Sequence, residues 1–419
     1  MKALIAKVGH TLTRPRGAVR HRYYRVRQSS RAGVALLMVL SSILLMTVLV
    51  SEIAYSATVR LSLASHHRDE AKAEALAFSG MQFYRLVLMA SKSLGRNPMI
   101  QTVGQYMGLN GDSLWQVLPS FNTGLIRMVF VSGSDIDTMG VGGTGAALTD
   151  EQIAETREST SSTKRNFLDF DGDFSAMVKD EARYIYVGGL RATDLQSLTQ
   201  LHPAQQLAGM MNKEEHNQFF YDNDLDRTEL IANLVDWTDA DDIRLFEGGY
   251  EESLYERLEN PYRPKNAPFD TREEIRLVDG WHLDSVWERF GRYLTIYGEG
   301  KVNVNTAPRP VLRGILTAYA DGYYAEQQID LWLDVLFQYR GRPVSADGVY
   351  FNSPQSFVQF MSEVVGMPLK QEVVQSITTE SSVFRVVSTG EVGDARVEVV
   401  AVYDFSSSPT GRVLNFRVR

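Results

Sequence analysis

Arg31-Ala32-Gly33, followed by the uncharged stretch VALLMVLSSILLMTVLV at 34–50, sets the architecture of this chain. The 33 residues up to Gly33 hold nine Lys or Arg and no Asp or Glu. A basic block beside an apolar helix keeps the N-terminus in the cytoplasm and sends the C-terminal side across the membrane. A secretory signal peptide carries its small-residue cleavage site after the apolar core. Because Gly33 stands before the core, we predict a leader cleaved between Gly33 and Val34, with the apolar helix kept on the mature protein.

The apolar stretch continues into a long helical pattern. Apolar residues recur at roughly 3.6-residue spacing through 54–87, and no proline interrupts them. This pattern predicts one helix over 34–95, apolar all round in its first half and amphipathic in its second. About 20 residues cross a hydrocarbon core, so the first half spans the membrane and the second stands in the periplasm.

The rest of the chain alternates between strand-like and helix-like segments. A strand is expected at 125–131, and a hairpin from the alternating segments 167–174 and 182–187. The segment 193–378 is mainly helical, and 379–419 again reads as strands. A helical block bracketed by strands predicts an α+β fold with an inserted helical domain.

Composition excludes several classes of site. The chain has no cysteine, which excludes disulfides, thiolate metal sites and cysteine nucleophiles. After Gly33 it holds 34 basic and 51 acidic residues, a formal charge of −17. The part of the chain after Gly33 is strongly acidic, which argues against binding to nucleic acid. The sequence contains no recognisable catalytic constellation.

An acidic, glycine-containing segment at 236–252 is the candidate metal site. Carboxylate oxygens, a Gly-Gly turn and free carbonyls are what Ca²⁺ prefers, and so many close carboxylates repel one another unless a cation neutralises them. The alternative is a helix end followed by a solvated acidic loop with Asp caps. The predicted ligands are Asp239, Asp241 and Glu251, then Asp242, Glu247 and Glu252.

Two other acidic clusters have simpler explanations. Asp222, Asp224, Asp226 and Glu229 follow part of an EF-hand spacing, but the required glycine is missing. A cap for the following helix is the preferred interpretation. The aspartates around Gly172 fit a turn better than an ion site.

Four segments carry a resemblance to a known family. LVDWTDADD at 234–242 is followed by EGGYEE at 247–252, then PYRPKNAPF at 261–269 and KVNVNTAP at 301–308. In this order they resemble the general secretion pathway protein K family, the large minor pseudopilin of type II secretion. The resemblance covers about 220–420 and includes Gly33 with its helix.

The resemblance implies a pilin-like frame, with the long helix on an antiparallel sheet and helix-hairpin-helix or SAM-like subdomains in the insertion. It implies a structural protein and not an enzyme, anchored in the inner membrane with its bulk in the periplasm. The domains it implies are a cleaved leader 1–33, a helix 34–95, a pilin-like part 96–192, a helical insertion 193–378 with its acidic loop, and strands 379–419.

The family also implies a place and partners. Its members sit at the tip of the secretion pseudopilus, where they help to initiate assembly and export of folded proteins. Their partners are the other minor pseudopilins, the major pseudopilin, the inner-membrane secretion platform and the prepilin peptidase, which also methylates the new N-terminus. Calcium binding in the insertion belongs to the same set of expectations.

The mature fifth residue would be Met38. Most pilins and pseudopilins have Glu there, which neutralises the N-terminal amine of a neighbouring subunit; the protein K family departs from this rule. A bare charge in the apolar fibre core is costly, so Met38 fits a subunit with nothing beyond it.

Two alternatives remain open at this point. One is a minor pilin of a type IV pilus. The other is a membrane-anchored periplasmic hydrolase that uses the acidic segment as a metal site. The second would need a water-open metal with a base.

Overall fold

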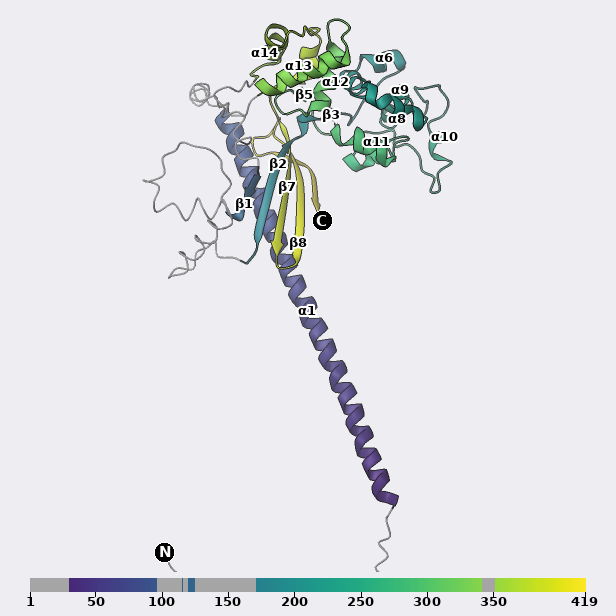
Figure 1. Ribbon diagram of the computed structural model, residues 1–419, viewed down its shortest axis with the longest axis vertical. Helices are drawn as coiled ribbons and strands as arrows, with labels where there is room; N and C mark the ends of the chain where they lie inside the picture. The colour runs from purple at the N-terminus through teal and green to yellow at the C-terminus, as the bar shows by residue number, and fades with distance from the viewer. Residues whose placement is uncertain (1–29, 96–114, 116–119, 125–170, 341–350) are drawn as a thin grey trace, which may run out of the picture. The chain divides into compact units, whose positions relative to one another are not determined.

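The computed structural model describes residues 30–95, 115, 120–124, 171–340 and 351–419 (Figure 1). The chain divides into two compact units, Met1–Ser65 and His66–Arg419. The strand expected at 125–131 lies outside the described residues.

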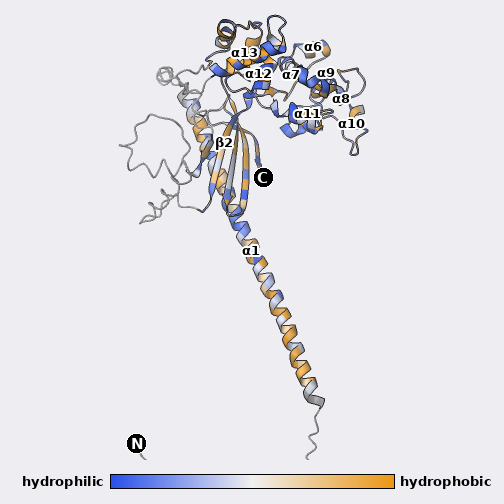
Figure 2. Ribbon diagram, viewed as in Figure 1, coloured by the Kyte–Doolittle hydropathy of each residue, from blue (hydrophilic) through white to orange (hydrophobic). Residues whose placement is uncertain are grey.

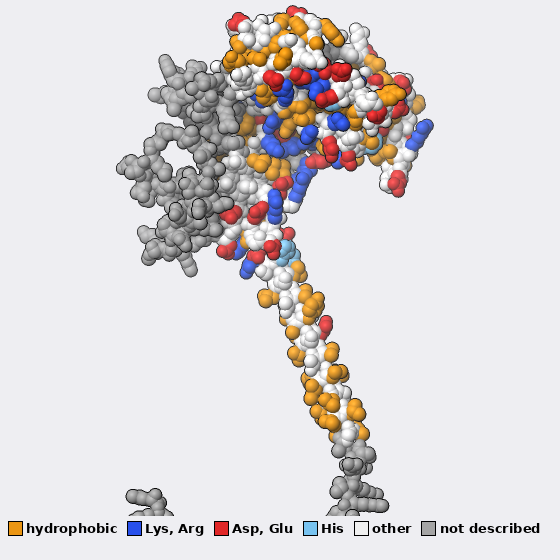
Figure 3. All heavy atoms as spheres, in the orientation of Figure 1, with side chains coloured by type: hydrophobic (Ala, Val, Ile, Leu, Met, Phe, Trp, Pro, Cys, Tyr) orange, Lys and Arg blue, Asp and Glu red, His pale blue; other side chains and the backbone are white. Residues whose placement is uncertain are grey.

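Helix α1 (Ser30–Gly95) confirms the predicted long helix. Every described side chain from Gly33 to Tyr55 is exposed, and the apolar ones dominate this part of the chain (Figure 2 and Figure 3). Ser41 Oγ and Thr47 Oγ1 donate to backbone carbonyls of the preceding turn, at 2.9 and 2.8 Å. Such internal pairing suits a helix in lipid. Among the described residues, α1 is the one helix whose length and composition fit a membrane span.

The second unit contains a five-stranded sheet in the order β1-β2-β7-β8-β9. Every neighbouring pair is antiparallel. The last three strands confirm the strands expected at the C-terminus. The strands are β1 (Ser120–Asn122), β2 (Asp173–Asp180), β7 (Val383–Val392), β8 (Ala395–Asp404) and β9 (Arg412–Val418).

One face of this sheet is covered by the part of α1 after Ser65 (Figure 1). Tyr84 and Leu88 of α1 are fully buried in one apolar cluster with Phe174 and Phe384. In β2, inward and outward residues alternate strictly along the strand, as a sheet with one covered face requires. The helix therefore has an exposed apolar first part and, further along, contributes to the core of the sheet domain.

The helical region lies between β2 and β7 in the sequence, so the predicted insertion is confirmed.

Helices α7 (His202–Met211) and α12 (Arg309–Tyr319) of this region cross at two glycines: a Cβ on Gly209 would lie 2.3 Å from the carbonyl oxygen of Gly314. Its α-helices are α6 (Leu195–Gln200), α7 (His202–Met211), α8 (Asn217–Asp222), α9 (Arg227–Asp236), α10 (Glu252–Tyr255), α11 (Asp284–Arg289), α12 (Arg309–Tyr319), α13 (Glu326–Tyr339), α14 (Pro354–Phe360) and α15 (Val373–Ser376).

Short elements link these helices. Two two-stranded parallel sheets pair β3 (Ile185–Tyr186) with β4 (Leu294–Thr295), and β5 (Val302–Asn303) with β6 (Ile377–Thr378). The 3₁₀ segments are Glu181–Arg183, Glu214–His216, Arg272–Leu277 and Gly291–Tyr293, and Met361–Val365 is a π-helical turn.

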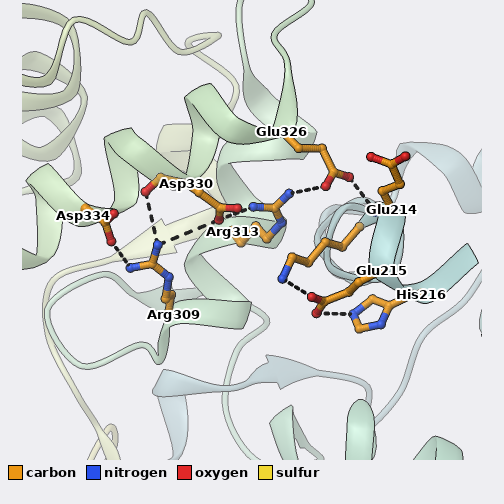
Figure 4. A network of polar contacts seen from close by, with 9 residues as sticks. Glu214, Glu215, His216, Arg309, Arg313, Glu326, Asp330 and Asp334 are labelled. Carbon is orange, nitrogen blue, oxygen red and sulfur yellow. Dashed lines mark hydrogen bonds and ion pairs between the residues drawn. The ribbon is translucent and has the colours of Figure 1, made fainter.

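Ion pairs tie α13 to α12 (Figure 4). The side chain of Arg313, 7% exposed, pairs with Asp330 and, at 3.3 Å, with Glu326. One turn earlier on α12, Arg309 pairs with Asp334 at 2.6 Å. Three acidic residues on one face of α13 are thus neutralised by two arginines of α12, which fixes the register of the two helices.

Asp180 joins the sheet to the helical region. It is fully buried and accepts hydrogen bonds from Asn303 Nδ2 (3.1 Å), Thr306 Oγ1 (2.6 Å), Ser381 Oγ (2.6 Å) and the backbone N–H of Ala182 (2.8 Å). Burial raises its pKa, and the four donors oppose that rise. The end of β2 is therefore held against the middle of the inserted segment, through Asn303 and Thr306, and against its C-terminal end, through Ser381.

Asn305 completes this junction. Its amide donates to the carbonyl oxygens of Phe351 (2.9 Å) and Thr379 (3.1 Å), and its side-chain oxygen accepts from the Phe351 N–H at 3.0 Å. The NVNTAP string at 303–308 that carried the family resemblance is thus a structural clamp.

The predicted hairpin of 167–174 and 182–187 is wrong where the structure describes it. β2 pairs with β1 and β7, and β3 pairs in parallel with β4. The second predicted arm contains β3, but the first overlaps β2 only at Asp173 and Phe174, and most of β2 lies where the turn was expected. Alternation reports which face of a strand is buried and says nothing about its partner.

Candidate metal centre

Three acidic side chains meet just beyond the end of α9. Asp236, Asp239 and Glu251 each offer a carboxylate oxygen, and these oxygens lie within 4.8 Å of one another. Asp236 is 3% exposed and Glu251 is 1% exposed. Asp239 is half-buried, but its Oδ1 is fully buried. We refer to these three residues as the acidic triad.

Helix α9 positions two members of the triad. It begins after Asp226, whose Oδ1 accepts from the backbone N–H of Thr228 (2.6 Å) and Glu229 (3.1 Å). This confirms the cap preferred over a partial EF-hand. Asp236 is the last residue of α9, and the Asp239 N–H donates to the Val235 carbonyl at 2.9 Å. The helical turn continues, so residues three apart lie on the same side.

A tight loop brings the third member back. Glu247, Gly248 and Gly249 have φ of 59°, 71° and 93°. Glycine adopts such values without strain, so the chain reverses here and returns towards α9. Glu251 follows after Tyr250, one residue before α10 begins at Glu252.

The triad is electrostatically unfavourable as it stands. Burial, with repulsion from the neighbouring carboxylates, raises the pKa of Asp236 to about 6, of Asp239 to about 7 and of Glu251 to about 8. Asp236 accepts from the Leu245 N–H at 3.2 Å. Three buried oxygens, both of Glu251 and Oδ1 of Asp239, have no hydrogen-bond partner among the described residues.

Buried acceptors without donors fit a cation. Leaving such groups unpaired is costly, whereas a hard divalent ion takes carboxylate oxygens as direct ligands. The donor set is all carboxylate oxygen, and water can complete the six to eight oxygen ligands that Ca²⁺ takes. The residues present therefore fit Ca²⁺.

Two of the six predicted ligands, Asp239 and Glu251, belong to the triad, and the other four lie outside it. Asp241 is exposed and its Oδ1 accepts from the Ile243 N–H at 2.9 Å. Its charge still raises the pKa of both Asp239 and Glu251. Asp242 is exposed and accepts from Asn266 Nδ2 at 2.9 Å.

Glu247 and Glu252 lie apart from the triad. Glu247 is exposed in the turn of the loop. Glu252 pairs with Arg263, whose Nε lies 2.6 Å from Oε1. Neither Glu247, which is exposed, nor Glu252, which is paired with Arg263, therefore belongs to the group of buried carboxylates that forms the triad.

Asp236 is the triad member that the sequence prediction omitted, because it was assigned to the helix end. Two signals could have identified it. It stands directly after the apolar run Leu234-Val235, where a carboxylate is buried with the helix. It also precedes Asp239 by three residues, a spacing that puts both carboxylates on one side of a helix.

The predicted processing residues lie on α1. Gly33 is exposed, and a Cβ built on it meets nothing within 4 Å. Packing therefore gives no reason for a glycine at this position. Met38 is 65% exposed on the same apolar segment.

Comparison with known proteins identifies part of the chain. Residues 195–299 match the family model described as "Type II secretion system (T2SS), protein K". This range includes the whole acidic segment, so the family resemblance drawn from the sequence is confirmed over residues 195–299. No curated protein matches the chain.

A solved structure from enterotoxigenic Escherichia coli, the GspK-GspI-GspJ complex of its type 2 secretion system, contains a similar chain. The identity is 15% and the TM-score 0.44, over 62% of this chain and 84% of that one.

Proposed function

We propose that this chain, a member of the type II secretion protein K family through its residues 195–299, is the large minor pseudopilin at the tip of a secretion pseudopilus. The observation that carries the proposal is the place of the family-matched segment. It lies between β2 and β7 of a sheet whose core is formed by α1. The same helix has an exposed apolar first part that suits a single membrane anchor.

The maturation that we propose starts at the N-terminus. A prepilin peptidase cleaves after Gly33 and methylates the amine of Val34, leaving α1 in the inner membrane and the bulk of the chain in the periplasm. The lack of packing around Gly33 supports a requirement for glycine that is set by the peptidase.

The position at the tip rests on two features. Met38 cannot neutralise the amine of a further subunit, and an uncompensated charge in the fibre core would be costly. The helical insertion adds bulk that a closely stacked fibre has no room for at every level. The subunit therefore caps the fibre and helps to start its assembly and the export of folded proteins.

We also propose that the acidic triad binds Ca²⁺. When bound, the ion neutralises Asp236, Asp239 and Glu251 and removes the repulsion among them. The orphaned oxygens of Glu251 support this assignment. Ca²⁺ would thus connect the end of α9 to the start of α10 and act structurally.

The proposed partners follow the family: the two smaller minor pseudopilins, counterparts of GspI and GspJ, together with the major pseudopilin and the secretion platform. The test is co-purification of the second unit, residues 66–419, with the soluble parts of the two smaller minor pseudopilins encoded with it. We expect one complex containing one copy of each. A monodisperse, unbound second unit in the presence of both partners would contradict the assignment.

A further inference from the structure

The loop that closes the acidic triad is a small hairpin, residues 242–251. The backbone N–H of Arg244 donates to the carbonyl of Gly249 at 3.0 Å, and the N–H of Glu251 donates to the carbonyl of Asp242 at 3.2 Å. These two bonds make the arms antiparallel. The second arm ends at Glu251, so the geometry of the hairpin and that of the triad depend on each other.

The hairpin holds two large side chains side by side in water. Ile243 and Tyr250 form an antiparallel bridge pair, and directly opposed residues of such a pair project from the same face. They are 61% and 73% exposed. Single exposed apolar residues are ordinary, but here the backbone pairing holds two of them together at a fixed place.

The hairpin and its flanks are acidic in sequence. The segment 239–252 contains six Asp or Glu and one basic residue, Arg244. Asp239 and Glu251 belong to the triad, and Glu252 is paired with Arg263. Arg244 points back to α9, where it pairs with Glu229 at 2.9 Å. Asp241, Asp242 and Glu247 are all exposed. Charge complementarity across an interface selects the opposite sign, so the matching surface has an apolar side chain flanked by Lys or Arg.

We propose that the bound cation stabilises this hairpin as a docking element for a basic, apolar segment of a partner protein. The inference rests on the Ca²⁺ site proposed above. Glu251 ends the hairpin and Asp239 stands three residues before its start, so a cation that takes oxygens from both side chains joins the two arms at their base. A two-stranded hairpin has little stability of its own in water. Cation binding and partner binding are therefore coupled.

The test uses the full chain in detergent micelles and a fluorescein-labelled peptide, Lys-Lys-Leu-Phe-Lys-Lys, as the probe. We expect it to bind with saturating Ca²⁺ and about tenfold more weakly with chelator, within the usual range of coupling between two sites. A peptide with Glu in place of Lys, and one with Ser in place of Leu and Phe, should not bind. Equal binding of the Glu peptide would overturn the charge assignment.

Two variants separate the hairpin from the metal site. Ile243→Ser with Tyr250→Ser should abolish peptide binding and keep the Ca²⁺-dependent rise in melting temperature. The control Tyr221→Ser removes a tyrosine that is 83% exposed elsewhere and should leave both unchanged. Retained peptide binding in the double variant, or Ca²⁺-dependent self-association of the chain through this pair, would overturn the proposal.

Hydrogen exchange provides a readout that does not need the peptide. The amides of Arg244 and Glu251, which close the hairpin, should exchange more slowly with Ca²⁺ than with chelator. If Ca²⁺ changes neither the melting temperature nor exchange, the metal site itself is wrong. If Ca²⁺ raises the melting temperature but neither these amides nor the peptide respond, the site stands and the docking hairpin is wrong.

Discussion

The carbonyl oxygen of Ala73 on α1 occupies the space where a side chain on Gly390 of β7 would begin. A Cβ on Gly390 would lie 2.0 Å from that oxygen and 2.8 Å from the backbone nitrogen of Ala77. Backbone atoms of a packed helix cannot rotate away as a side chain can. The helix and the sheet therefore approach each other at the closest distance that a glycine allows.

Replacing Gly390 with Ala should accordingly destabilise the second unit. Overpacking a core costs about 1–3 kcal/mol, which lowers the melting temperature by roughly 1–2 °C for each kcal/mol in a unit as large as His66–Arg419. The control is Gly189→Ala, where the nearest atom to the new Cβ is 3.6 Å away. Equal melting temperatures for the two variants would show that α1 shifts freely on the sheet.

Removal of Ca²⁺ should destabilise the protein. A ligand at a hundredfold excess over its dissociation constant stabilises the folded state by about 2.7 kcal/mol, measurable as the difference between melting curves with Ca²⁺ and with chelator. Asp239→Asn and Glu251→Gln should each greatly reduce this difference. Glu247→Gln and Glu252→Gln, which alter the two predicted ligands that lie apart from the triad, should keep it. If only Glu247→Gln and Glu252→Gln lost the Ca²⁺-dependent difference in melting temperature, the ion would bind at those residues and not at the triad.

The contribution of the acidic triad to the stability of the Ca²⁺-free protein should fall as pH rises from about 4 to 8. The folded triad has pKa values raised to about 6, 7 and 8, so it retains protons that the unfolded chain releases near its ordinary values. Wherever the unfolded state binds fewer protons, stability decreases with pH. The contribution is fully present below the ordinary carboxylate pKa and lost above the raised one.

The double variant Asp239→Asn, Glu251→Gln isolates this effect from other titrating groups. With chelator and near pH 4, the melting temperature of the double variant should match or fall below that of the wild type. As pH rises to 8, the melting temperature of the double variant should rise relative to that of the wild type. Saturating Ca²⁺ should remove the wild-type loss at high pH, because the ion replaces the protons. Parallel pH curves for the two proteins would contradict the raised pKa values.

Gly33→Leu should block processing in cells that carry the prepilin peptidase. The full-length chain should accumulate in the inner membrane, and N-terminal sequencing of the wild type should begin at Val34. Gly17→Leu changes another glycine of the leader and should be processed normally. A mature N-terminus after the apolar stretch would defeat the proposal.

Met38→Glu should not turn the chain into a fibre-forming subunit. The new carboxylate could serve a further amine, but the helical insertion would still block stacking. Electron microscopy of membranes producing only this variant should show no filaments. Filaments of the chain alone, with the insertion intact, would contradict the capping role.

Local patterns in the sequence were sufficient for much of the architecture. The basic leader and apolar stretch predicted α1, because hydrophobic length and charge asymmetry are properties of contiguous residues. The C-terminal segment was recognisable as strands, which became β7, β8 and β9. Asp226 was identifiable as a helix cap because a cap bonds to residues two and three positions away. The acidic segment was recognisable from composition alone.

Contacts between distant residues were decided only in the tertiary structure. Asp236 and Glu251 stand fifteen residues apart in sequence, and whether they meet depends on a loop reversal and on burial against the helical region. The sequence predicted six ligands without Asp236 and placed Asp241 among the first three, because the pKa and the free oxygens of a carboxylate depend on surroundings that composition does not contain. The same holds for Gly390, whose need to be glycine is set by Ala73, a residue on a helix more than three hundred positions away. The sequence thus determined which elements form, while packing determined which of their residues face one another.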